Sequence, residues 1–554
     1  MLIKQLAARN LNQNIRIDNK VDSDAAREKM NLDHDVLAVI MKDLETRQTL
    51  LPLMKTCRTL YQTGLPYLLG LPLIFSVQPS HRKFNEDFRR YIRSHPSYTE
   101  YIKVVSIYTY IEDECIFDLL SLILKDACRL ESLGVNLDIK KETRAKLLAP
   151  HSSISSLRYL SLENVDEPER NMLKTFNAPL DGLLLTFAAT IHDDNLLNPI
   201  PLLHNFSKSL RFLMTSFASW TYQESGETTI LPNVRILNII DCGVPNSTTI
   251  IRAFPNLSHL AIVEESLDID VEELARLRSS NVEGSSGLRP WSILEEVRAK
   301  DISLLYALGL TCKVNRMVLE YCPSSNSQMK EAQVVLSDMR PTILNISFFS
   351  EAFLGVPAEY MAHMFAYGEL THLSLKLYFD ESENGDDMDT GILRAIETIR
   401  RATKLEYLNL AIRWSRPCRP SANLRNILRE AARIRRAEAG EDVEGDSDSD
   451  DAIPPDPMGE HVDDMDHRVI ASQIFDALES LQVVVLNFQP VEQKMKMLTR
   501  GWRVMKGASS LKEGVAYEVN DIAGPKEISV EECRGLDESY GHDDDDFYFR
   551  LGVC

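Results

Sequence analysis

The stretch PNVRILNIIDCGVPNSTTIIRAFPNLSHLAI, residues 232–262, contains two consecutive copies of one pattern. Each copy opens with Pro-Asn and continues with apolar residues spaced as Leu-x-x-Leu-x-Leu, starting at Val234 and at Leu257. Because side chains alternate along a short strand, we expect the three apolar residues of each copy to point inward. Intervening side chains such as Arg235 and His259 should then lie on or near the exposed face.

The same pattern recurs over most of the chain. Successive copies start 20 to 37 residues apart, except for the last pair, and leucine-rich repeats have periods of about 20–29 residues. Segments between copies, such as Cys115–Leu124 and Gly391–Ile399, have the apolar spacing of helices. The copies start at Ile102, Leu130, Leu157, Leu180, Leu210, Val234, Leu257, Leu294, Val314, Ile343, Leu370, Leu405 and Leu481.

This alternation of strand and helix predicts an α/β fold. Each unit cannot bury its apolar side alone, and stacking the units buries one continuous core. We therefore predict an irregular leucine-rich-repeat solenoid of parallel strands and helices over residues 101–490. A single α/β domain with parallel strands, in which strands also alternate with helices, is the alternative.

The cysteines of the chain are dispersed. The nine residues include no CxxC pair, so neither a zinc site nor a thioredoxin-like motif is indicated. An odd number of scattered cysteines suits a reducing compartment, the cytoplasm or the nucleus. Cys242 and Cys322 end two of the copies at a position where leucine-rich repeats carry Asn or Cys. The resemblance implies structural thiols that satisfy the backbone of the turn.

The segment Asn31–Leu69 precedes the first copy and has two amphipathic stripes. Asp33 or Asp35 is expected to cap the first helix, and Thr49 the second. So short a segment cannot bury this much apolar surface alone, so it must pack on the rest of the chain or on a partner. The first stripe contains Val36, Leu37, Ile40, Met41 and Leu44, and the second contains Leu50, Leu51, Leu53, Met54, Cys57, Leu60 and Tyr61.

This segment resembles an F-box, whose pattern is Leu-Pro, a hydrophobic helix ending in Leu, a polar break and a Leu-rich helix ending near Cys-Arg-x-Trp. Asp33 stands in place of the Pro, and Leu60-Tyr61 in place of the Trp. An ordinary helical hairpin that caps the array is the alternative. For the F-box core or adaptor-binding surface, the resemblance implies Leu32, Val36, Leu37, Ile40, Leu44, Leu50, Leu53 and Cys57.

The remaining segments are a flexible tail at 1–30, the F-box-like module at 31–70, a helical connector at 71–100 and a C-terminal cap with an acidic tail at 491–554. An acidic insertion at about 437–467 is expected to be disordered, because it is rich in charge and Pro. It holds thirteen Asp or Glu between Glu438 and Asp466 and no Lys or Arg.

Two acidic features of these segments suggest phosphorylation and cation binding. Ser447 and Ser449 lie among carboxylates, which predicts phosphorylation by an acid-directed kinase; a solvated loop is the alternative. The run Asp543–Asp546 has the ligand type for Ca²⁺ or Mg²⁺ but lacks the Gly and Glu of a calcium loop, so it is interpreted as a solvated patch.

Charge and motifs exclude several classes of function. The formal net charge of −21 disfavours nucleic-acid and anionic-membrane binding, since both require a basic surface. No apolar run approaches the roughly 18 residues that would span a bilayer. The sequence contains no P-loop, GxGxxG, HExxH or GxSxG motif, so no catalytic, cofactor-binding or metal-binding residue is assigned.

A docking module followed by a repeat array resembles F-box proteins with leucine-rich repeats, including many fungal ones. The resemblance implies binding to a Skp-type adaptor, which joins such proteins to a cullin–RING ubiquitin ligase, while the repeats bind a protein substrate. On this interpretation the chain is a non-catalytic substrate receptor. The alternatives are a ligase-independent leucine-rich-repeat scaffold and an α/β enzyme without a recognisable motif.

Overall fold

In a computed structural model, the chain divides into two compact units, Met1–Leu71 and Pro72–Cys554. Within the described residues, the first unit contains three helices, and the second contains all of the strands. The structure describes residues 34–44, 46–76, 79–109, 114–126, 128–137, 154–188, 198–220, 229–264, 269–288, 291–320, 325–356, 361, 363–379, 385–414, 461–462, 464–490, 498–503 and 526–528.

The described part of the first unit has three helices, where the two apolar stripes predict two. They are α2 (His34–Lys42), α3 (Arg47–Met54) and α4 (Arg58–Gly70). The second stripe breaks at Cys57, whose thiol sulfur accepts a hydrogen bond from the backbone N–H of Leu60 at 3.4 Å and so caps α4. Thr46 caps α3, because its hydroxyl accepts from the N–H of Thr49 at 3.3 Å. The expected cap at Thr49 is therefore wrong.

The second unit is built on one sheet of sixteen strands, which follow one another in chain order. Strands β1–β14 are parallel, and β15 and β16 are added antiparallel. The strands are β1 (Leu73–Ser76), β2 (Val104–Thr109), β3 (Ser132–Leu137), β4 (Tyr159–Val165), β5 (Gly182–Phe187), β6 (Phe212–Ser216), β7 (Ile236–Ile240), β8 (His259–Val263), β9 (Ile293–Ala299), β10 (Lys313–Leu319), β11 (Ile343–Phe349), β12 (His372–Phe379), β13 (Tyr407–Trp414), β14 (Val483–Pro490), β15 (Leu498–Arg503) and β16 (Lys526–Ile528).

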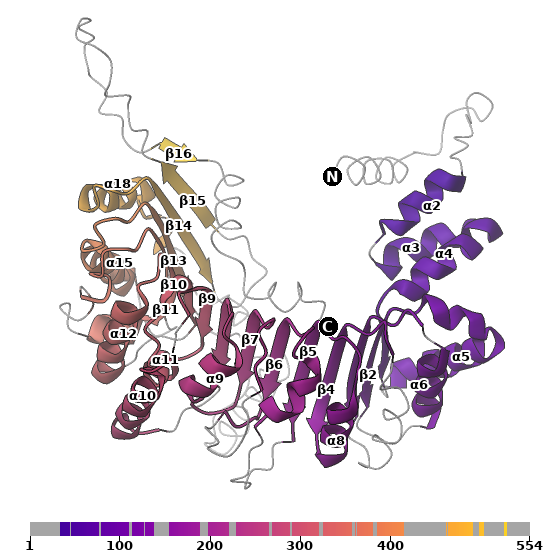
Figure 1. The fold of residues 1–554 in the computed structure, drawn as a ribbon. Coiled ribbons are helices and arrows are strands. Elements are labelled where there is room, and N and C mark those ends of the chain that lie inside the picture. The colour runs from indigo at the N-terminus through magenta and orange to yellow at the C-terminus, as the bar shows by residue number, and fades with distance from the viewer. Residues whose placement is uncertain are drawn as a thin grey trace, which may run out of the picture. The chain divides into compact units, whose positions relative to one another are not determined.

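Helices connect many of these strands and lie along one face of the sheet (Figure 1). The opposite face carries no helix among the described residues, and we call it the helix-free face. The helices of this unit are α5 (Pro79–Ser94), η1 (Pro96–Tyr101), α6 (Glu114–Asp126), α8 (Glu167–Thr175), η3 (Ile200–Phe206), α9 (Ser247–Ala253), α10 (Val271–Ser285), α11 (Ile302–Leu308), α12 (Asn326–Met339), α13 (Ser350–Gly355), α15 (Gly385–Ile399) and α18 (His467–Ala477).

Strand β12 shows how the repeated pattern builds the core. Leu373, Leu375, Leu377 and Phe379 are buried, and the residues between them are half-buried on the helix-free face. The inward residues of successive copies join one continuous apolar cluster that runs from β1 to β14. The fold is therefore α/β, with strands stacked in order as in a solenoid.

One copy of the pattern was placed in the wrong register. Ile343 aligns with Arg316 of β10, which lies on the helix-free face, whereas the next residue, Leu344, aligns with the inward Met317. The copy therefore begins at Pro341, and Ile343 is not an inward residue. A run of apolar residues allowed two registers, and only the neighbouring strand distinguishes them.

Two segments contain strands that the sequence analysis did not predict for them. The segment 71–100, expected to be a helical connector, supplies β1 as well as α5 and most of η1. The segment 491–554 supplies β15 and β16. Among the described helices, none is long and apolar enough to cross a membrane.

Candidate functional site

Gly64 marks the point where the three helices of the first unit meet. A Cβ atom added there would lie 2.5 Å from Cγ of Met54 on α3 and 3.2 Å from Sδ of Met41 on α2. Both methionine side chains are buried. The absence of a side chain at Gly64 therefore lets α4 pack closely against its two neighbours.

The residues implied by the F-box resemblance divide between the core and the surface of this unit. Leu50 is fully buried, so it belongs to the core. Leu37, Ile40, Leu44 and Leu53 are half-buried. Val36 and Cys57 are exposed, and Leu32 lies outside the described residues. Asp35 lies inside α2 and does not precede it as a cap, and Asp33 is also outside the described residues.

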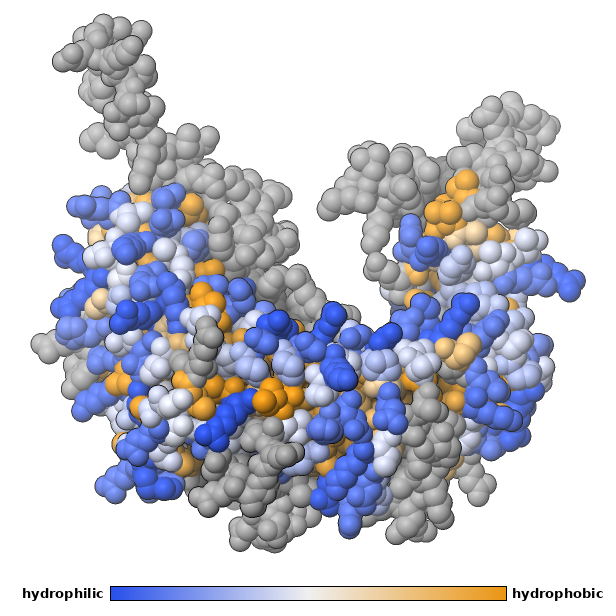
Figure 2. All heavy atoms as spheres, viewed as in Figure 1, coloured by the Kyte–Doolittle hydropathy of each residue, from blue (hydrophilic) through white to orange (hydrophobic). Residues whose placement is uncertain are grey.

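Helix α2 presents apolar side chains to the surface. Val36 is 45% exposed and Val39, one turn later, is 61% exposed. Figure 2 shows apolar residues, coloured orange, gathered over this helix. Sequence reasoning missed Val39, although its i+3 spacing from Val36 was visible, because the stripe was drawn through Leu37 and Met41 instead. Two exposed valines on one helix are a candidate docking surface.

Cys242 has the structural role that the repeat resemblance implied. Its buried sulfur accepts a hydrogen bond from the N–H of Ala218 at 3.1 Å and donates to the carbonyl oxygen of Ile240 at 3.0 Å. Burial raises the pKa of this thiol to about 11, so it stays protonated at neutral pH. Cys322, the second cysteine of this kind, lies outside the described residues.

The helix-free face changes character along the sheet. Its positions on β2–β8 hold apolar, hydroxyl and amide residues, glycines, one histidine, His259, and one carboxylate, Glu163, with no Lys or Arg. The basic residues of this face on β9–β13 are Arg298, Arg316, Lys376 and Arg413. The C-terminal part of the face is therefore the basic part, in a chain whose net charge is −21.

The charges on β9 and β10 partly cancel. The carboxylate of Glu296 lies 3.6 Å from the guanidinium of Arg298 and 3.9 Å from that of Arg316. All three side chains are largely buried, so each charge needs a partner of the opposite sign. Glu296 therefore lies within ion-pair distance of both arginines, one on its own strand and one on the neighbouring strand.

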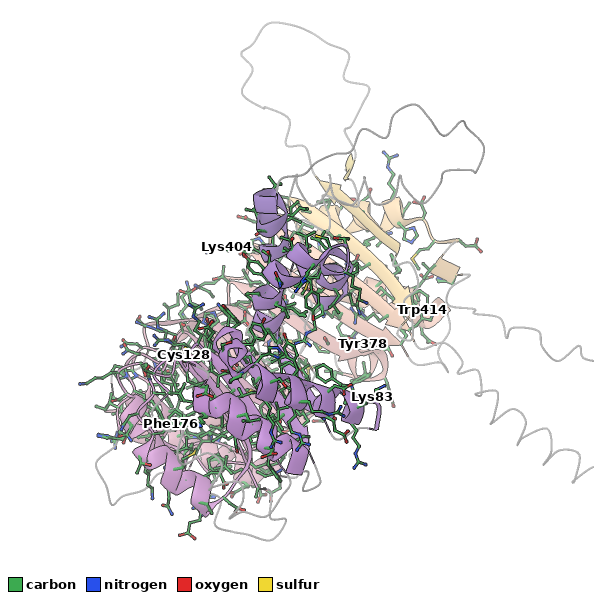
Figure 3. The ribbon with its side chains drawn as sticks, turned by 90° about the vertical axis from the view of Figure 1, so that its right-hand side faces the viewer. Lys83, Cys128, Phe176, Tyr378, Lys404 and Trp414 are labelled. Carbon is green, nitrogen blue, oxygen red and sulfur yellow. The ribbon has the colours of Figure 1, made fainter. Side chains whose placement is uncertain are left out.

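On β11–β13 aromatic and basic side chains form a row across the sheet. Phe349 pairs in register with Tyr378, and Tyr378 pairs with Arg413. The rings of Phe349 and Tyr378 lie 5.9 Å apart, and the Arg413 guanidinium lies 5.8 Å from the centre of the Tyr378 ring. Figure 3 labels Tyr378 on β12 and Trp414, which follows Arg413 on β13.

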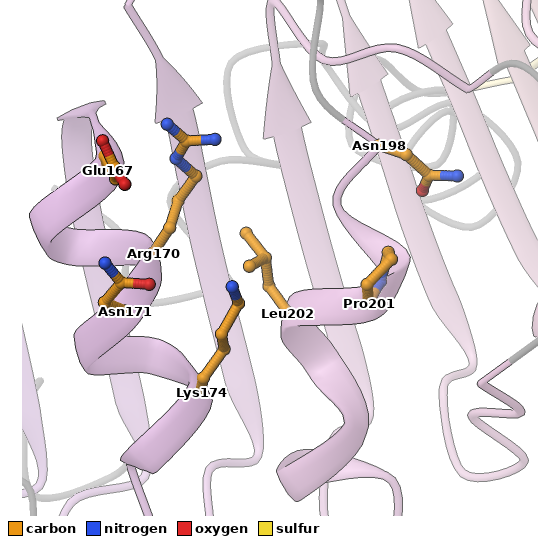
Figure 4. A pocket seen from close by; sticks show the side chains of 7 residues that line it. All are labelled: Glu167, Arg170, Asn171, Lys174, Asn198, Pro201 and Leu202. Atoms are coloured by element: carbon orange, nitrogen blue, oxygen red, sulfur yellow. The ribbon is translucent and has the colours of Figure 1, made fainter. Parts of the chain in front are cut away.

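A pocket of about 280 Å³ lies on the helical side of the sheet, between α8 and η3. Arg170 and Lys174 extend from α8 toward it, and Asn198, Pro201 and Leu202 line it from the other side (Figure 4). The carboxylate of Glu167 also lines the pocket, but no nucleophile lies beside it among the lining residues. We assign the pocket no catalytic chemistry.

Several candidate residues cannot be placed. The phosphorylation candidates Ser447 and Ser449 and the run Asp543–Asp546 lie outside the described residues. Within the part of the chain that the structure describes, no three His, Cys, Asp or Glu residues are grouped as a metal site would require.

Comparison with known proteins gives no relative by which the chain could be classified. No protein-family model matches the sequence, and no curated protein is similar to it.

Proposed function

We propose that this chain is the non-catalytic substrate-recognition subunit of a Skp–cullin–F-box ubiquitin ligase. The observation that carries the proposal is the exposed apolar pair Val36 and Val39 on α2, in a helical unit that is compact by itself and precedes the stacked sheet. The F-box resemblance of residues 31–70 implies that Val36 belongs to the surface that binds a Skp-type adaptor, and we add Val39 to this surface.

Burial separates the residues that stabilise the module from those that are available to a partner. Leu50, Met41 and Met54 hold the three helices together, so they act on docking only through the fold. Val36 and Val39 are available to a partner, and burying each would contribute roughly 1 kcal/mol. Docking then depends on side chains that the module itself does not need for stability.

The sheet unit supplies the second half of the proposal. We assign its strands to degenerate leucine-rich repeats, and its helix-free face to a protein substrate. Such a receptor breaks no bond itself. It raises the effective concentration of substrate lysines near the ubiquitin-loaded enzyme that the cullin–RING scaffold holds.

Recovery of the adaptor with tagged full-length chain tests this proposal. We expect a Skp-type adaptor to bind the wild-type chain, and Val39→Glu to weaken binding by about tenfold or more, because a carboxylate would be buried against an apolar partner. The matched control is Leu393→Glu on α15, where the leucine is 58% exposed in the other unit.

Equal binding by both variants would contradict the assignment of α2 as the docking surface. No recovery of an adaptor by the wild-type chain would favour a ligase-independent repeat scaffold. The phosphorylation of Ser447 and Ser449 stays a prediction, which intact-mass analysis of the chain from native cells would test.

A further inference from the structure

The pocket between α8 and η3 lies on the helical side of the sheet and has one polar wall (Figure 4). Its volume of about 280 Å³ is just below the roughly 300–1,000 Å³ of most small-molecule sites, so it holds one small group. The polar wall is a single face of α8, because its lining residues are spaced three and four positions apart. They are Glu167, Arg170, Asn171 and Lys174.

Contacts between α8 and η3 hold the two walls of the pocket in place. The side-chain amide of Asn205 on η3 donates a hydrogen bond to the backbone carbonyl oxygen of Lys174. The buried rings of Phe176 and Phe206 lie 6.2 Å apart and join the end of α8 to η3. These contacts use none of the side chains that line the pocket, so the walls are positioned independently of any ligand.

Arg170 is a partly buried cation without a counter-charge. Among the described residues, its buried Nε has no hydrogen-bond partner, and neither Arg170 nor Lys174 forms an ion pair. Burial of part of the guanidinium removes water that would screen its charge, which strengthens its attraction for an anion in the pocket. Such a cation is unfavourable by itself, and an anion at its terminal nitrogens would offset that cost.

The charges that line the pocket define the anion more narrowly. Two cations and the carboxylate of Glu167 leave one net positive charge, which a monoanion balances better than a dianion. The planar fork of an arginine matches the two oxygens of a carboxylate. Glu167 repels a simple anion, but it accepts a hydrogen bond from a ligand that carries an N–H or O–H beside its negative group.

The wall formed by η3 adds a donor and an apolar surface. The side-chain oxygen of Asn198 accepts a hydrogen bond from the N–H of Ile200 at 3.0 Å, which leaves its NH₂ group for a ligand. Pro201 and Leu202 line the pocket next to Asn198 and suit the short carbon skeleton of a small acid.

From these observations we propose that the pocket between α8 and η3 binds a carboxylate with an N–H or O–H donor beside it. Arg170 and Lys174 hold the carboxylate, and Glu167 accepts the hydrogen bond of the donor. Two sources have this chemistry, a free small amino-acid or hydroxy-acid derivative and the C-terminus of a peptide. The inference does not rest on the proposed function, because the pocket involves neither α2 nor the helix-free face.

Ligand-detected NMR titration with purified full-length chain tests the proposal. The probe is N-acetylalanine, which has an amide N–H beside its carboxylate, and the control is the same compound with a neutral C-terminal amide. We expect the acid to bind at least about tenfold more tightly than the amide. Equal binding of the two compounds would overturn the proposal, and so would tighter binding of sulfate, a dianion without a donor.

Charge removal locates the site. Arg170→Gln with Lys174→Gln should reduce binding of N-acetylalanine at least about tenfold. The control is Arg82→Gln with Lys83→Gln on α5, which changes the net charge equally and should have little effect. Should the double change unfold the sheet, Lys174→Gln alone, at an exposed position, should keep the fold and weaken binding severalfold. Unchanged binding in folded pocket variants would contradict the assignment.

Glu167 tests whether the ligand needs a donor. N-acetyl-N-methylalanine keeps the carboxylate but lacks the N–H, so it should bind the wild-type chain severalfold more weakly than N-acetylalanine. Glu167→Ala removes the acceptor and should reduce this difference. Equal binding of the two acids by the wild-type chain would overturn the assignment of a donor to the ligand.

A peptide distinguishes the two sources of the carboxylate. Tighter binding of a tetrapeptide with a free C-terminal alanine than of N-acetylalanine would support a chain terminus, and equal or weaker binding would support a free acid. Binding that requires Asp193 and Asp194 to be replaced by Asn would overturn the proposal, because the pocket would then belong to the chain's own carboxylates. Failure of adaptor binding with intact acid binding would remove the proposed function and leave this inference standing.

Discussion

The three-helix unit and the sheet unit bury their apolar residues in different ways. In the sheet, most copies of the repeated pattern add three inward residues to a cluster that extends from Leu73 to Phe488. A repeat in such a stack contacts mainly its neighbours, so the loss of one contact weakens mainly the repeat that makes it and the adjoining repeats. The helical unit has one small core, made in its described part of Met41, Leu50, Met54, Leu60, Leu65 and Leu69.

This difference bears on what each unit can do. A core of so few residues cannot cover all the apolar side chains of three helices, and Val36 and Val39 stay at the surface. The sheet covers the apolar residues of one face with helices, and its other face holds both apolar and polar side chains, with the basic residues on β9–β13. One unit therefore has apolar residues available for docking, and the other has an extended face whose basic residues lie on its C-terminal strands.

The largest expected effect separates the two faces of the sheet. Leu344 is fully buried on the helical side, so Leu344→Ala should lower the free energy of unfolding by about 2–5 kcal/mol. Its neighbour Ile343 is half-buried on the helix-free face, so Ile343→Ala should cost under about 1 kcal/mol. All four tryptophans lie in the sheet unit, so urea unfolding followed by tryptophan fluorescence reports on it alone.

The adjacent pair is its own control, because both changes shorten an apolar side chain on one strand. A larger cost for Ile343→Ala than for Leu344→Ala would restore the register that the sequence pattern suggested. Hydrogen exchange in α2–α4 should be unchanged by either substitution, since these helices belong to the other unit.

Ile343 and Leu344 also show which features of the fold the sequence predicts and which it does not. The spacing of apolar residues located every strand from β2 to β14, because three inward positions per strand leave a strong repeated pattern. It misplaced Ile343, where the adjoining leucine allowed either register. It predicted two N-terminal helices, because the break at Cys57 depends on a cap that the apolar stripe does not reveal.

The candidate sites were harder to predict than the strands. The exposure of Val39 and the row of Phe349, Tyr378 and Arg413 both depend on which residues are brought together from separate elements. The three residues of that row lie on three strands, about 30 residues apart at each step, and nothing in their local sequence marks them. Only the register of neighbouring strands aligns them.

A glycine in each unit tests whether the neighbouring side chain can move away from an added methyl group. Gly64→Ala would press a methyl group against the buried Met54, so it should destabilise the helical unit by about 1–3 kcal/mol. Gly182→Ala meets Tyr159 at the same distance of 2.5 Å, but that ring is 40% exposed and can turn aside. We expect a change of under about 0.5 kcal/mol there.

Hydrogen exchange of α2–α4 measures the first change, and tryptophan fluorescence measures the second. Comparable destabilisation by both substitutions would mean that the Tyr159 ring is held as firmly as a core side chain. Protection of α2–α4 that is unaltered by Gly64→Ala would mean that the helices do not meet at this residue.

The smallest effect concerns two thiols that play the same part in the two units. Cys57 and Cys242 each accept a hydrogen bond from a backbone N–H, at 3.4 and 3.1 Å, but Cys57 is exposed and Cys242 is buried. Water can replace the thiol of Cys57, so Cys57→Ala should cost under about 0.5 kcal/mol, whereas Cys242→Ala leaves a buried donor unpaired and should cost about 1–2 kcal/mol. Cys242→Ser keeps an acceptor and should cost less than Cys242→Ala. In the folded chain, iodoacetamide should modify Cys57 and spare Cys242. The burial of Cys242 and its pKa of about 11 both disfavour the reactive thiolate. Rapid modification of Cys242 would show that its turn opens.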